Sequence, residues 1–166
     1  MPTQLHSYQS RALEELHNGK RAIFYSYGTG KSRIALDYSL YLNSHVVIFC
    51  KLRNVATWQR ELHKWYPEIS TDDIIAVQGN KKDRVALFEC FDQQPRILII
   101  PYSIVLRDKE YLSYYLDKLP PERIIADEST TIKNPAAGVT KVLLKIRERL
   151  PDYTQCILLT GNPIPE

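Results

Sequence analysis

The sequence predicts an α/β domain in which a mainly parallel central sheet is flanked by helices. Three observations indicate this fold class. Short apolar, β-prone runs alternate along the chain with segments whose apolar residues repeat at helical spacing. Two of the runs, HVVIFC and RILII, are almost entirely apolar, which is typical of strands buried on both faces. Chemically distinctive residues follow the ends of several runs, where parallel sheets bind their ligands.

Length and composition fit one globular domain, which we expect to be a monomer. The chain has 166 residues, of which 44% are hydrophobic and 25% charged, and its net charge is +3. That charge permits a nucleic-acid partner without requiring one. No apolar run approaches the roughly 20 residues of a membrane span, so we expect no membrane contact and a cytoplasmic or nucleoid-associated location. The three widely spaced cysteines are expected to be reduced thiols.

The first element with a chemical signal is the segment YSYGTGKS at residues 25–32. An apolar run at 21–25 precedes it, and a segment with helical spacing follows at 34–42. The order strand, glycine-rich loop, helix is the context in which a loop ending in Gly-Lys-Ser binds phosphate.

The residues of this loop suit a bound nucleotide. Gly28 and Gly30 let the backbone approach an anion closely. Lys31 would reach the β- and γ-phosphates, and the Ser32 hydroxyl would ligate Mg²⁺. The strict phosphate-loop pattern has glycine where this chain has Tyr25, so an ordinary turn with a surface lysine stays open at this point.

A short amphipathic helix is predicted upstream of the loop, over residues 5–16. It contains Gln9, whose side-chain amide has both a donor and an acceptor and can pair with an adenine edge. A solvated helix residue is the alternative interpretation of Gln9.

The later elements follow the same alternation. Further strands are predicted at 45–50, 73–77, 96–100, 123–128 and 155–160, with helices at 55–65, from residue 81, at 111–119 and at 139–150. The tryptophans of the helix at 55–65 are expected to pack in the core.

Cations follow two of these strands. Lys51 and Arg53 could contact a phosphate backbone or be solvated loop charges. Lys81, Lys82 and Arg84 open a helix, where positive charge opposes the helix dipole. The placement hints at an anionic partner, and a solvated face is the alternative.

The strand expected at 123–128 ends in two adjacent carboxylates. Asp127 would hold Mg²⁺ through its water shell, and Glu128 would orient and deprotonate the attacking water. An exposed acidic turn is the alternative. Lys31, both acids and Thr160 are all expected at the carboxyl ends of strands, so we expect them to converge.

With these blocks in this order, the chain resembles the first, N-terminal RecA-like domain of Swi/Snf-type superfamily-two DNA helicases and translocases. The resemblance covers essentially the whole chain. The matching blocks are Tyr8-Gln9, GTGKS at 28–32, VVIFCKLRNVATWQREL at 46–62, LIIPYSIVLRD at 98–108, DESTTIKN at 127–134 and LLTGNPI at 158–164.

The resemblance implies a three-layer RecA-like P-loop domain over residues 1–166 that uses ATP and Mg²⁺ and couples ATP hydrolysis to movement on nucleic acid. The partner in the full enzyme would be DNA, expected to be double-stranded. The implied ATP site comprises Tyr8, Gln9, Gly28, Thr29, Gly30, Lys31, Ser32 and Thr160. Lys31, Asp127 and Glu128 would be catalytic, Ser32 and Asp127 would hold Mg²⁺, and Lys51, Arg53, Tyr102 and Ser103 would contact the nucleic acid.

Three departures from the family pattern matter. Ser129-Thr130 stand where the family usually has Ala-His, which leaves open how Thr160 senses the nucleotide and is reminiscent of phage-encoded members. Lys51 replaces the usual proline. We expect the second RecA-like domain, which completes the ATP site in the family, to lie outside these 166 residues, and we expect weak or no hydrolysis by this domain alone. The alternatives are a nucleic-acid or protein-binding module without turnover and a P-loop kinase.

Overall fold

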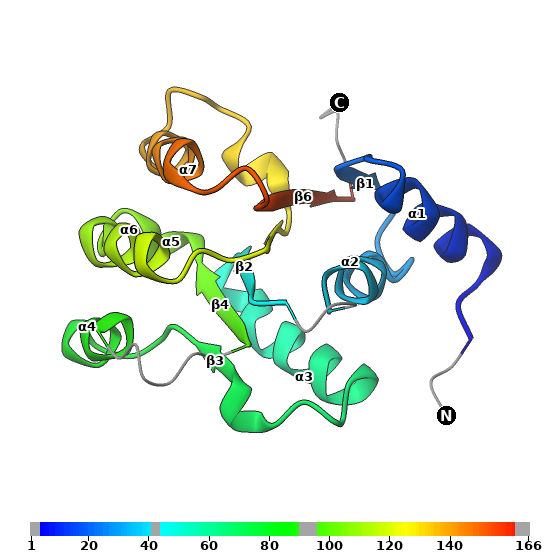
Figure 1. Ribbon diagram of the computed structural model, residues 1–166, viewed down its shortest axis with the longest axis horizontal. Coiled ribbons are helices and arrows are strands. Elements are labelled where there is room, and N and C mark those ends of the chain that lie inside the picture. Colours follow the sequence, from blue (N-terminus) through cyan, green and yellow to red (C-terminus); the bar gives the residue numbers. More distant parts are fainter. Residues whose placement is uncertain (1–3, 41–43, 90–95, 162–166) are drawn as a thin grey trace.

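Six strands form one sheet at the centre of the molecule, and every neighbouring pair is parallel (Figure 1). The structure, a computed structural model, describes residues 4–40, 44–89 and 96–161. Within these residues the strand order is β1-β6-β5-β2-β4-β3. The strands are β1 (Ala22–Phe24), β2 (Val46–Cys50), β3 (Ile74–Ala76), β4 (Ile97–Pro101), β5 (Arg123–Ala126) and β6 (Gln155–Thr160).

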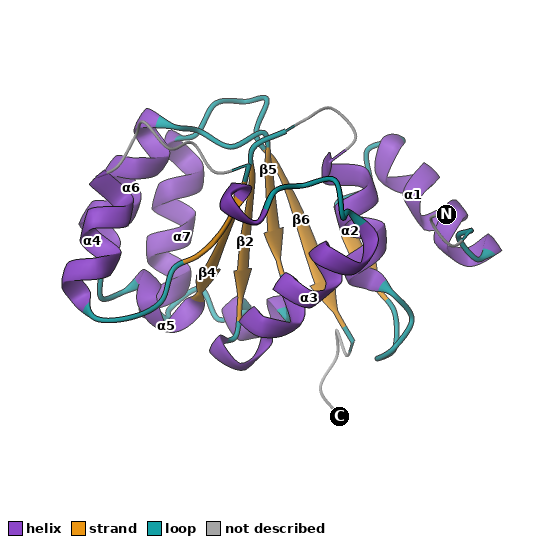
Figure 2. Ribbon diagram, turned by 90° about the horizontal axis from the view of Figure 1, so that it is seen from below, coloured by secondary structure: helices purple, strands orange, loops and turns teal. Residues whose placement is uncertain are grey.

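Helices cover both faces of the sheet. One layer contains α1 (Ser7–His17), α2 (Lys31–Leu40) and α3 (Val55–Trp65), and the other contains α4 (Lys81–Glu89), α5 (Tyr102–Val105), α6 (Lys109–Lys118) and α7 (Gly138–Arg149) (Figures 1 and 2). Short 3₁₀ turns are η1 (Leu52–Asn54), η2 (Thr71–Asp73) and η3 (Ser129–Ile132). The predicted α/β class, with a parallel sheet between helical layers, is confirmed.

The central strand β2 explains why the sheet needs two helical layers. All five of its residues are buried. Val46, Ile48 and Cys50 pack into the hydrophobic cluster under α1 to α3, whereas Val47 and Phe49 pack into the cluster under α4 to α7. Because side chains alternate across a strand, a run that is apolar at every position requires cover on both faces.

Most predicted elements differ from the observed ones only at their ends. The helix predicted at 34–42 begins earlier, at Lys31, so the phosphate loop leads directly into its first turn. The strand predicted at 123–128 ends at Ala126, and the two acids lie in the turn beyond it. Expectations for Tyr41, Leu42, Cys90, Phe91 and the residues after Gly161 lie outside the described part of the chain.

Both predicted interpretations of Arg84 are wrong, because this arginine is an internal structural cation. Its side chain is 8% exposed, and its guanidinium donates two hydrogen bonds to the Asp108 carboxylate, from Nε at 2.5 Å and from Nη2 at 3.1 Å. Nη1 donates a third bond, at 2.7 Å, to the Gly79 carbonyl. Lys81 and Lys82, in the same turn, are exposed.

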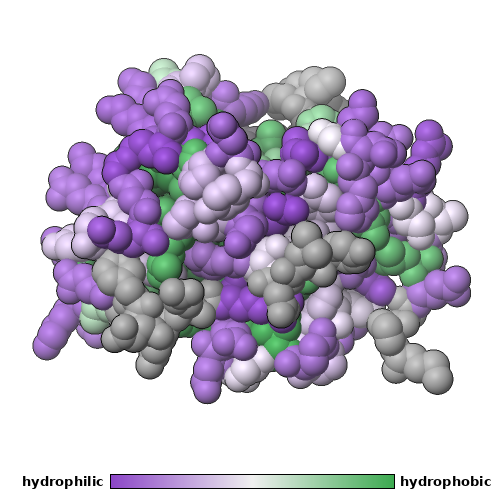
Figure 3. All heavy atoms as spheres, in the orientation of Figure 1, coloured by the Kyte–Doolittle hydropathy of each residue, from purple (hydrophilic) through white to green (hydrophobic). Residues whose placement is uncertain are grey.

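The face drawn in Figure 3 is mostly polar, with apolar side chains visible between the polar ones. None of the helices within the described ranges is long and apolar enough to span a bilayer. Cys50 and Cys156 are free. Burial, and then the charges of Asp127 and Glu128, raise the pKa of the Cys50 thiol to about 12, so this thiol stays protonated.

Candidate functional site

A cleft of about 570 Å³ collects most of the residues that the sequence analysis singled out. It lies where the loops after β1 and β5 approach α1 and α3. Its lining includes Tyr8 and Gln9 from α1, Gly28, Gly30, Lys31 and Ser32 from the phosphate loop, Asn54, Trp58 and Trp65 near and on α3, and the acids Asp127 and Glu128. The expected convergence of the phosphate loop and the acidic pair is therefore present.

Glycine is required at two positions of the phosphate loop. Gly28 and Gly30 have φ angles of 76° and 77°, in the left-handed region that other residues rarely adopt. A Cβ atom on Gly30 would also lie 2.4 Å from Nε2 of Gln9, which is too close for any contact. A side chain at residue 30 would therefore strain the backbone and displace the Gln9 amide from its bond to Thr29.

The helix α1 is fastened to this loop by two side chains. The Tyr8 hydroxyl and the Gln9 amide Nε2 both donate to the Thr29 carbonyl, at 3.0 and 3.1 Å. The Gln9 carbonyl oxygen accepts a bond from the His6 backbone at 3.0 Å. Gln9 is only 6% exposed, which excludes the interpretation that it is a solvated helix residue.

Lys31 is turned into the loop rather than into solvent. Its ammonium donates to the Tyr25 and Ser26 carbonyls, each at 2.8 Å, and lies 5.4 Å from the centre of the Tyr27 ring. Burial lowers the pKa of Lys31, and the nearby charge of Asp127 partly opposes that shift. These contacts and its place in the cleft exclude a plain surface lysine.

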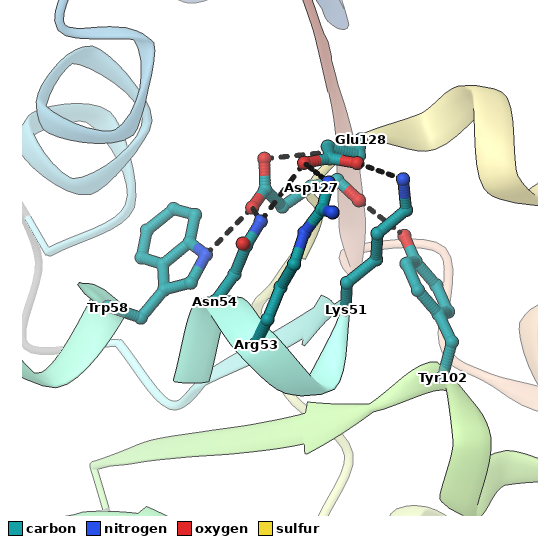
Figure 4. Close-up of polar contacts among 7 residues, drawn as sticks. All are labelled: Lys51, Arg53, Asn54, Trp58, Tyr102, Asp127 and Glu128. Atoms are coloured by element: carbon teal, nitrogen blue, oxygen red, sulfur yellow. Dashed lines mark hydrogen bonds and ion pairs between the residues drawn. The ribbon is translucent and has the colours of Figure 1, made fainter. Parts of the chain in front are cut away.

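The Asp127 carboxylate is held by donors from three directions (Figure 4). One oxygen accepts bonds from the Trp58 indole at 3.0 Å and from the Asn54 amide at 3.1 Å. The other accepts the backbone N–H of Glu128 at 2.9 Å. The Tyr102 hydroxyl donates to the Asp127 backbone carbonyl at 2.9 Å. The carboxylate is thereby fixed in orientation at the floor of the cleft.

Glu128 is clamped by cations from the segment that follows β2. Its carboxylate pairs with Lys51 and, at 3.5 Å, with Arg53, and it accepts a bond from Asn54 at 3.2 Å. Burial alone would raise the pKa of Glu128, but the bonds from Lys51 and Asn54 and the charges of Lys51 and Arg53 lower it overall. The side chain is 16% exposed, which excludes an exposed acidic turn.

The backbone at Glu128 is unusual as well. Its φ of 47° is the only positive value at a non-glycine residue in the described ranges. A residue with a Cβ atom costs roughly 1–2 kcal/mol in this conformation. The turn sends the Glu128 side chain toward Lys51 while Asp127 points toward Trp58 (Figure 4).

Two of the predicted site residues lie elsewhere than expected. Tyr102 is 4% exposed and uses its hydroxyl on Asp127, so it supports the acidic pair and offers no surface to a nucleic acid. Burial and then the Asp127 charge raise its pKa, so the hydroxyl stays a donor. Thr160 does not line the phosphate cleft. It lies with Thr130 in a second, largely apolar cavity of about 430 Å³ beside α7.

The predicted nucleic-acid residues Lys51, Arg53 and Ser103 are more accessible. The Arg53 side chain is 73% exposed, the Lys51 side chain is 39% exposed, and Ser103 is an exposed residue in the first turn of α5. Lys51 and Arg53 are at present paired with Glu128, so they are not simply solvated charges.

Asn54 and Trp58 are site residues that the sequence analysis did not identify. Trp58 was expected to pack in the core, and it does so, at 2% exposed. Its spacing of four residues from Asn54 places both polar groups on one side of the chain as η1 leads into α3. That spacing would identify Asn54 and Trp58 as site residues only if Asp127 and Glu128 were already known to face this helix.

Replacing Trp58 by phenylalanine tests the support of Asp127. The ring packing is largely kept, but Asp127 loses a hydrogen bond at a partly buried carboxylate. We expect the free energy of unfolding to fall by about 1.5–3 kcal/mol, as for other bonds to charged groups. Urea unfolding measures it. The matched control is Trp65→Phe in the same helix, which removes an indole bond to Glu61; Trp65 is half-buried whereas Trp58 is buried, so we expect a smaller loss of about 1 kcal/mol or less. An equal loss in both variants would contradict a special role for Trp58.

The cleft also fits a magnesium ion bound together with phosphate. Ser32 and Asp127 supply oxygen atoms, which Mg²⁺ prefers, and both line the cleft. Within the ranges that the structure describes, no group of three or more His, Cys, Asp or Glu side chains could hold a metal unaided. Mg²⁺ is usually held by one or two protein ligands, water and substrate phosphates, and the residues present suit that arrangement.

Comparisons with known proteins point in the same direction. The family model described as the SNF2-related domain matches residues 4–166. The chain is 28% identical to the ISWI chromatin-remodeling complex ATPase ISW1 of Saccharomyces cerevisiae, over 97% of this chain and 14% of that protein. It is 27% identical to the human DNA annealing helicase and endonuclease ZRANB3, over 88% of this chain and 13% of that protein.

A third relative gives a similar match over a shorter region. The chain is 28% identical to the chromodomain-helicase-DNA-binding protein 1-like of Danio rerio, over 76% of this chain and 11% of that protein. The chain therefore spans only 11–14% of the length of these three relatives.

Proposed function

The chain belongs to the family of SNF2-related domains, and from this premise we propose that it is the ATP-binding domain of a DNA-dependent ATPase that couples hydrolysis to movement on DNA. The observation that carries the proposal is the single cleft in which a phosphate loop, its lysine and two adjacent acids meet. The names of the relatives, an ATPase of chromatin remodelling and a DNA annealing helicase, support the same activity.

The phosphate loop and the residues around the acidic pair have separate roles in this proposal. The backbone of Gly28 to Ser32 would bind the phosphates, and Lys31 would exchange the Tyr25 and Ser26 carbonyls for phosphate oxygens. Ser32 and Asp127 would hold Mg²⁺, which supplies charge neutralisation at the phosphates when bound. Trp58 and Asn54 keep Asp127 in place for this task.

Glu128 would position the attacking water and accept its proton. A carboxylate next to the metal-binding acid, at the floor of the same cleft, suits that role. Gln9 would contact the adenine with the second N–H and the second oxygen lone pair of its amide, which the bonds with Thr29 and His6 leave available. Thr160 would act indirectly, through the cavity that it shares with Thr130.

We propose further that residues 1–166 form an N-terminal RecA-like domain whose ATP site a second RecA-like domain completes. An arginine supplied across such an interface contributes on the order of 10³–10⁵ in rate in comparable enzymes. Hydrolysis by this chain alone is therefore expected to be slow. We propose double-stranded DNA as the nucleic-acid partner, contacted by Lys51, Arg53 and Ser103. The proposed location is the cytoplasm or the nucleoid.

The alternative, a binding module that keeps the fold without turnover, has less support. Such a module would have no need for Lys31, Ser32, Asp127 and Glu128 together, and all four line the cleft. A P-loop kinase would need an acceptor alcohol beside the phosphates, whereas the adjacent acids suit activation of water.

The proposal is tested by Lys31→Ala. The variant removes the cation that would pair with the phosphates, and a charged hydrogen bond is worth about 1.5–3 kcal/mol, so Mg·ATP should bind about 10- to 150-fold more weakly. Calorimetric titration with and without Mg²⁺ measures this. Lys20→Ala is the matched control, because Lys20 is exposed beyond the other end of β1 and should leave binding unchanged. Unchanged binding in Lys31→Ala would refute the proposed ATP site.

A further inference from the structure

Two accessible cations beside the acidic pair are engaged by the residue proposed to activate water. Lys51 and Arg53 flank the Glu128 carboxylate from different sides (Figure 4). Both come from the short segment between β2 and α3.

The carboxylate and the two cations of this contact differ in how much of each side chain is exposed to solvent. The Glu128 side chain is 16% exposed, whereas the side chains of Lys51 and Arg53 are 39% and 73% exposed. An incoming phosphate can therefore reach the cations from solvent while the carboxylate stays inside the cleft. Each cation can serve Glu128 or an outside anion, because both anions compete for the same few N–H donors.

We propose that the DNA backbone and Glu128 compete for Lys51 and Arg53, so that DNA binding releases Glu128 from its ion pairs. This inference rests on the proposed function and adds a mode of regulation to the same site. Without DNA, the carboxylate is held by both cations and by Asn54. With DNA phosphates on Lys51 and Arg53, the carboxylate keeps only its bond from Asn54 and can turn toward the nucleotide.

Thermodynamic linkage makes the proposal measurable without hydrolysis. If DNA binding weakens the contacts of Glu128, then those contacts must weaken DNA binding by the same factor. Removing the negative charge of Glu128 should therefore tighten DNA binding in the absence of any nucleotide. A residue that served only catalysis would have no such effect.

The experiment measures the affinity of the chain for a short fluorescently labelled DNA duplex by anisotropy, without nucleotide. Glu128→Gln is expected to bind about 3- to 10-fold more tightly than the original chain, since two partly exposed ion pairs are removed. Lys51→Ala should bind more weakly and lower the slope of log affinity against log salt by about 1. In a chain that carries both Lys51→Ala and Arg53→Ala, Glu128→Gln should change affinity by less than about 2-fold.

Asp127→Asn is the matched control. It removes the adjacent negative charge, but Asp127 pairs with Trp58 and Asn54 rather than with the two cations. Equal tightening by Asp127→Asn and Glu128→Gln would indicate a general charge effect and overturn the exchange. Unchanged affinity in Glu128→Gln, with weaker binding in Lys51→Ala, would overturn the exchange and leave DNA as the partner. No DNA binding by any variant would overturn both, while the ATP site is decided separately by Lys31→Ala.

Discussion

Glu128→Gln is expected to abolish ATP hydrolysis by the chain while leaving Mg·ATP binding nearly intact. The amide cannot accept a proton from water, and general bases typically contribute on the order of 10²–10⁴ in rate. Glutamine has nearly the same shape as glutamate and is strained to the same degree at a φ of 47°, so the turn after β5 should be kept. Single-turnover hydrolysis of radiolabelled ATP measures the rate, with protein in excess, long incubations and a DNA duplex present to release Glu128 from its ion pairs.

Glu61→Gln is the control for this experiment. Glu61 is another glutamate that lines the cleft, and it accepts a bond from Trp65 without touching Asp127. It should hydrolyse ATP as the original chain does. If Glu128→Gln also kept that rate, Glu128 would not be the base and the binding module without turnover would gain support.

The largest loss of stability is expected from Asp108→Asn. The change leaves the Arg84 guanidinium buried without its counter-charge, with 8% of the arginine side chain and 1% of the aspartate side chain exposed in the intact pair. Breaking one partner of a buried pair typically costs 3–5 kcal/mol, so we expect the free energy of unfolding to fall by about that amount. Urea unfolding followed by far-ultraviolet circular dichroism measures it.

Two further variants test whether the loss of stability comes from the uncompensated charge of Arg84 or from any substitution in this region. Asp117→Asn breaks the more exposed ion pair with Arg149 and should cost about 1 kcal/mol or less. Replacing both members of the buried pair, with Arg84→Met and Asp108→Leu, should recover most of the loss. A double variant as unstable as Asp108→Asn would show that the pair supplies more than mutual neutralisation.

The fold was predictable because its signals are local and repeated. The all-apolar β2 requires cover on both faces, and helix α3 was predicted with its observed bounds from the spacing of Val55, Trp58, Leu62 and Trp65. Element ends were less certain. Nothing in the sequence indicates that Glu128 adopts a left-handed backbone in the turn that follows β5, because a residue with a Cβ atom rarely adopts that conformation.

The site was predictable where a motif has one usual role, and less so where a single side chain can take several roles. The Gly-Lys-Ser loop and the adjacent acids were predicted to converge, and they share a cleft. By contrast, Arg84 pairs internally with Asp108, 24 residues away, and Tyr102 supports Asp127 from 25 residues away. A cation or a phenol can serve the core or the surface, and only the folded chain decides between them.

The pairing of β1 has a consequence for how this protein is made. β1 carries the phosphate loop, is the edge strand of the described sheet, and pairs only with β6, from Ala22 opposite Leu158 to Phe24 opposite Thr160. During synthesis, the chain must therefore be made through Thr160 before β1 has its partner, and long-range pairing of this kind forms late. Until β6 has been made, the phosphate loop follows a strand that has no partner in the described sheet.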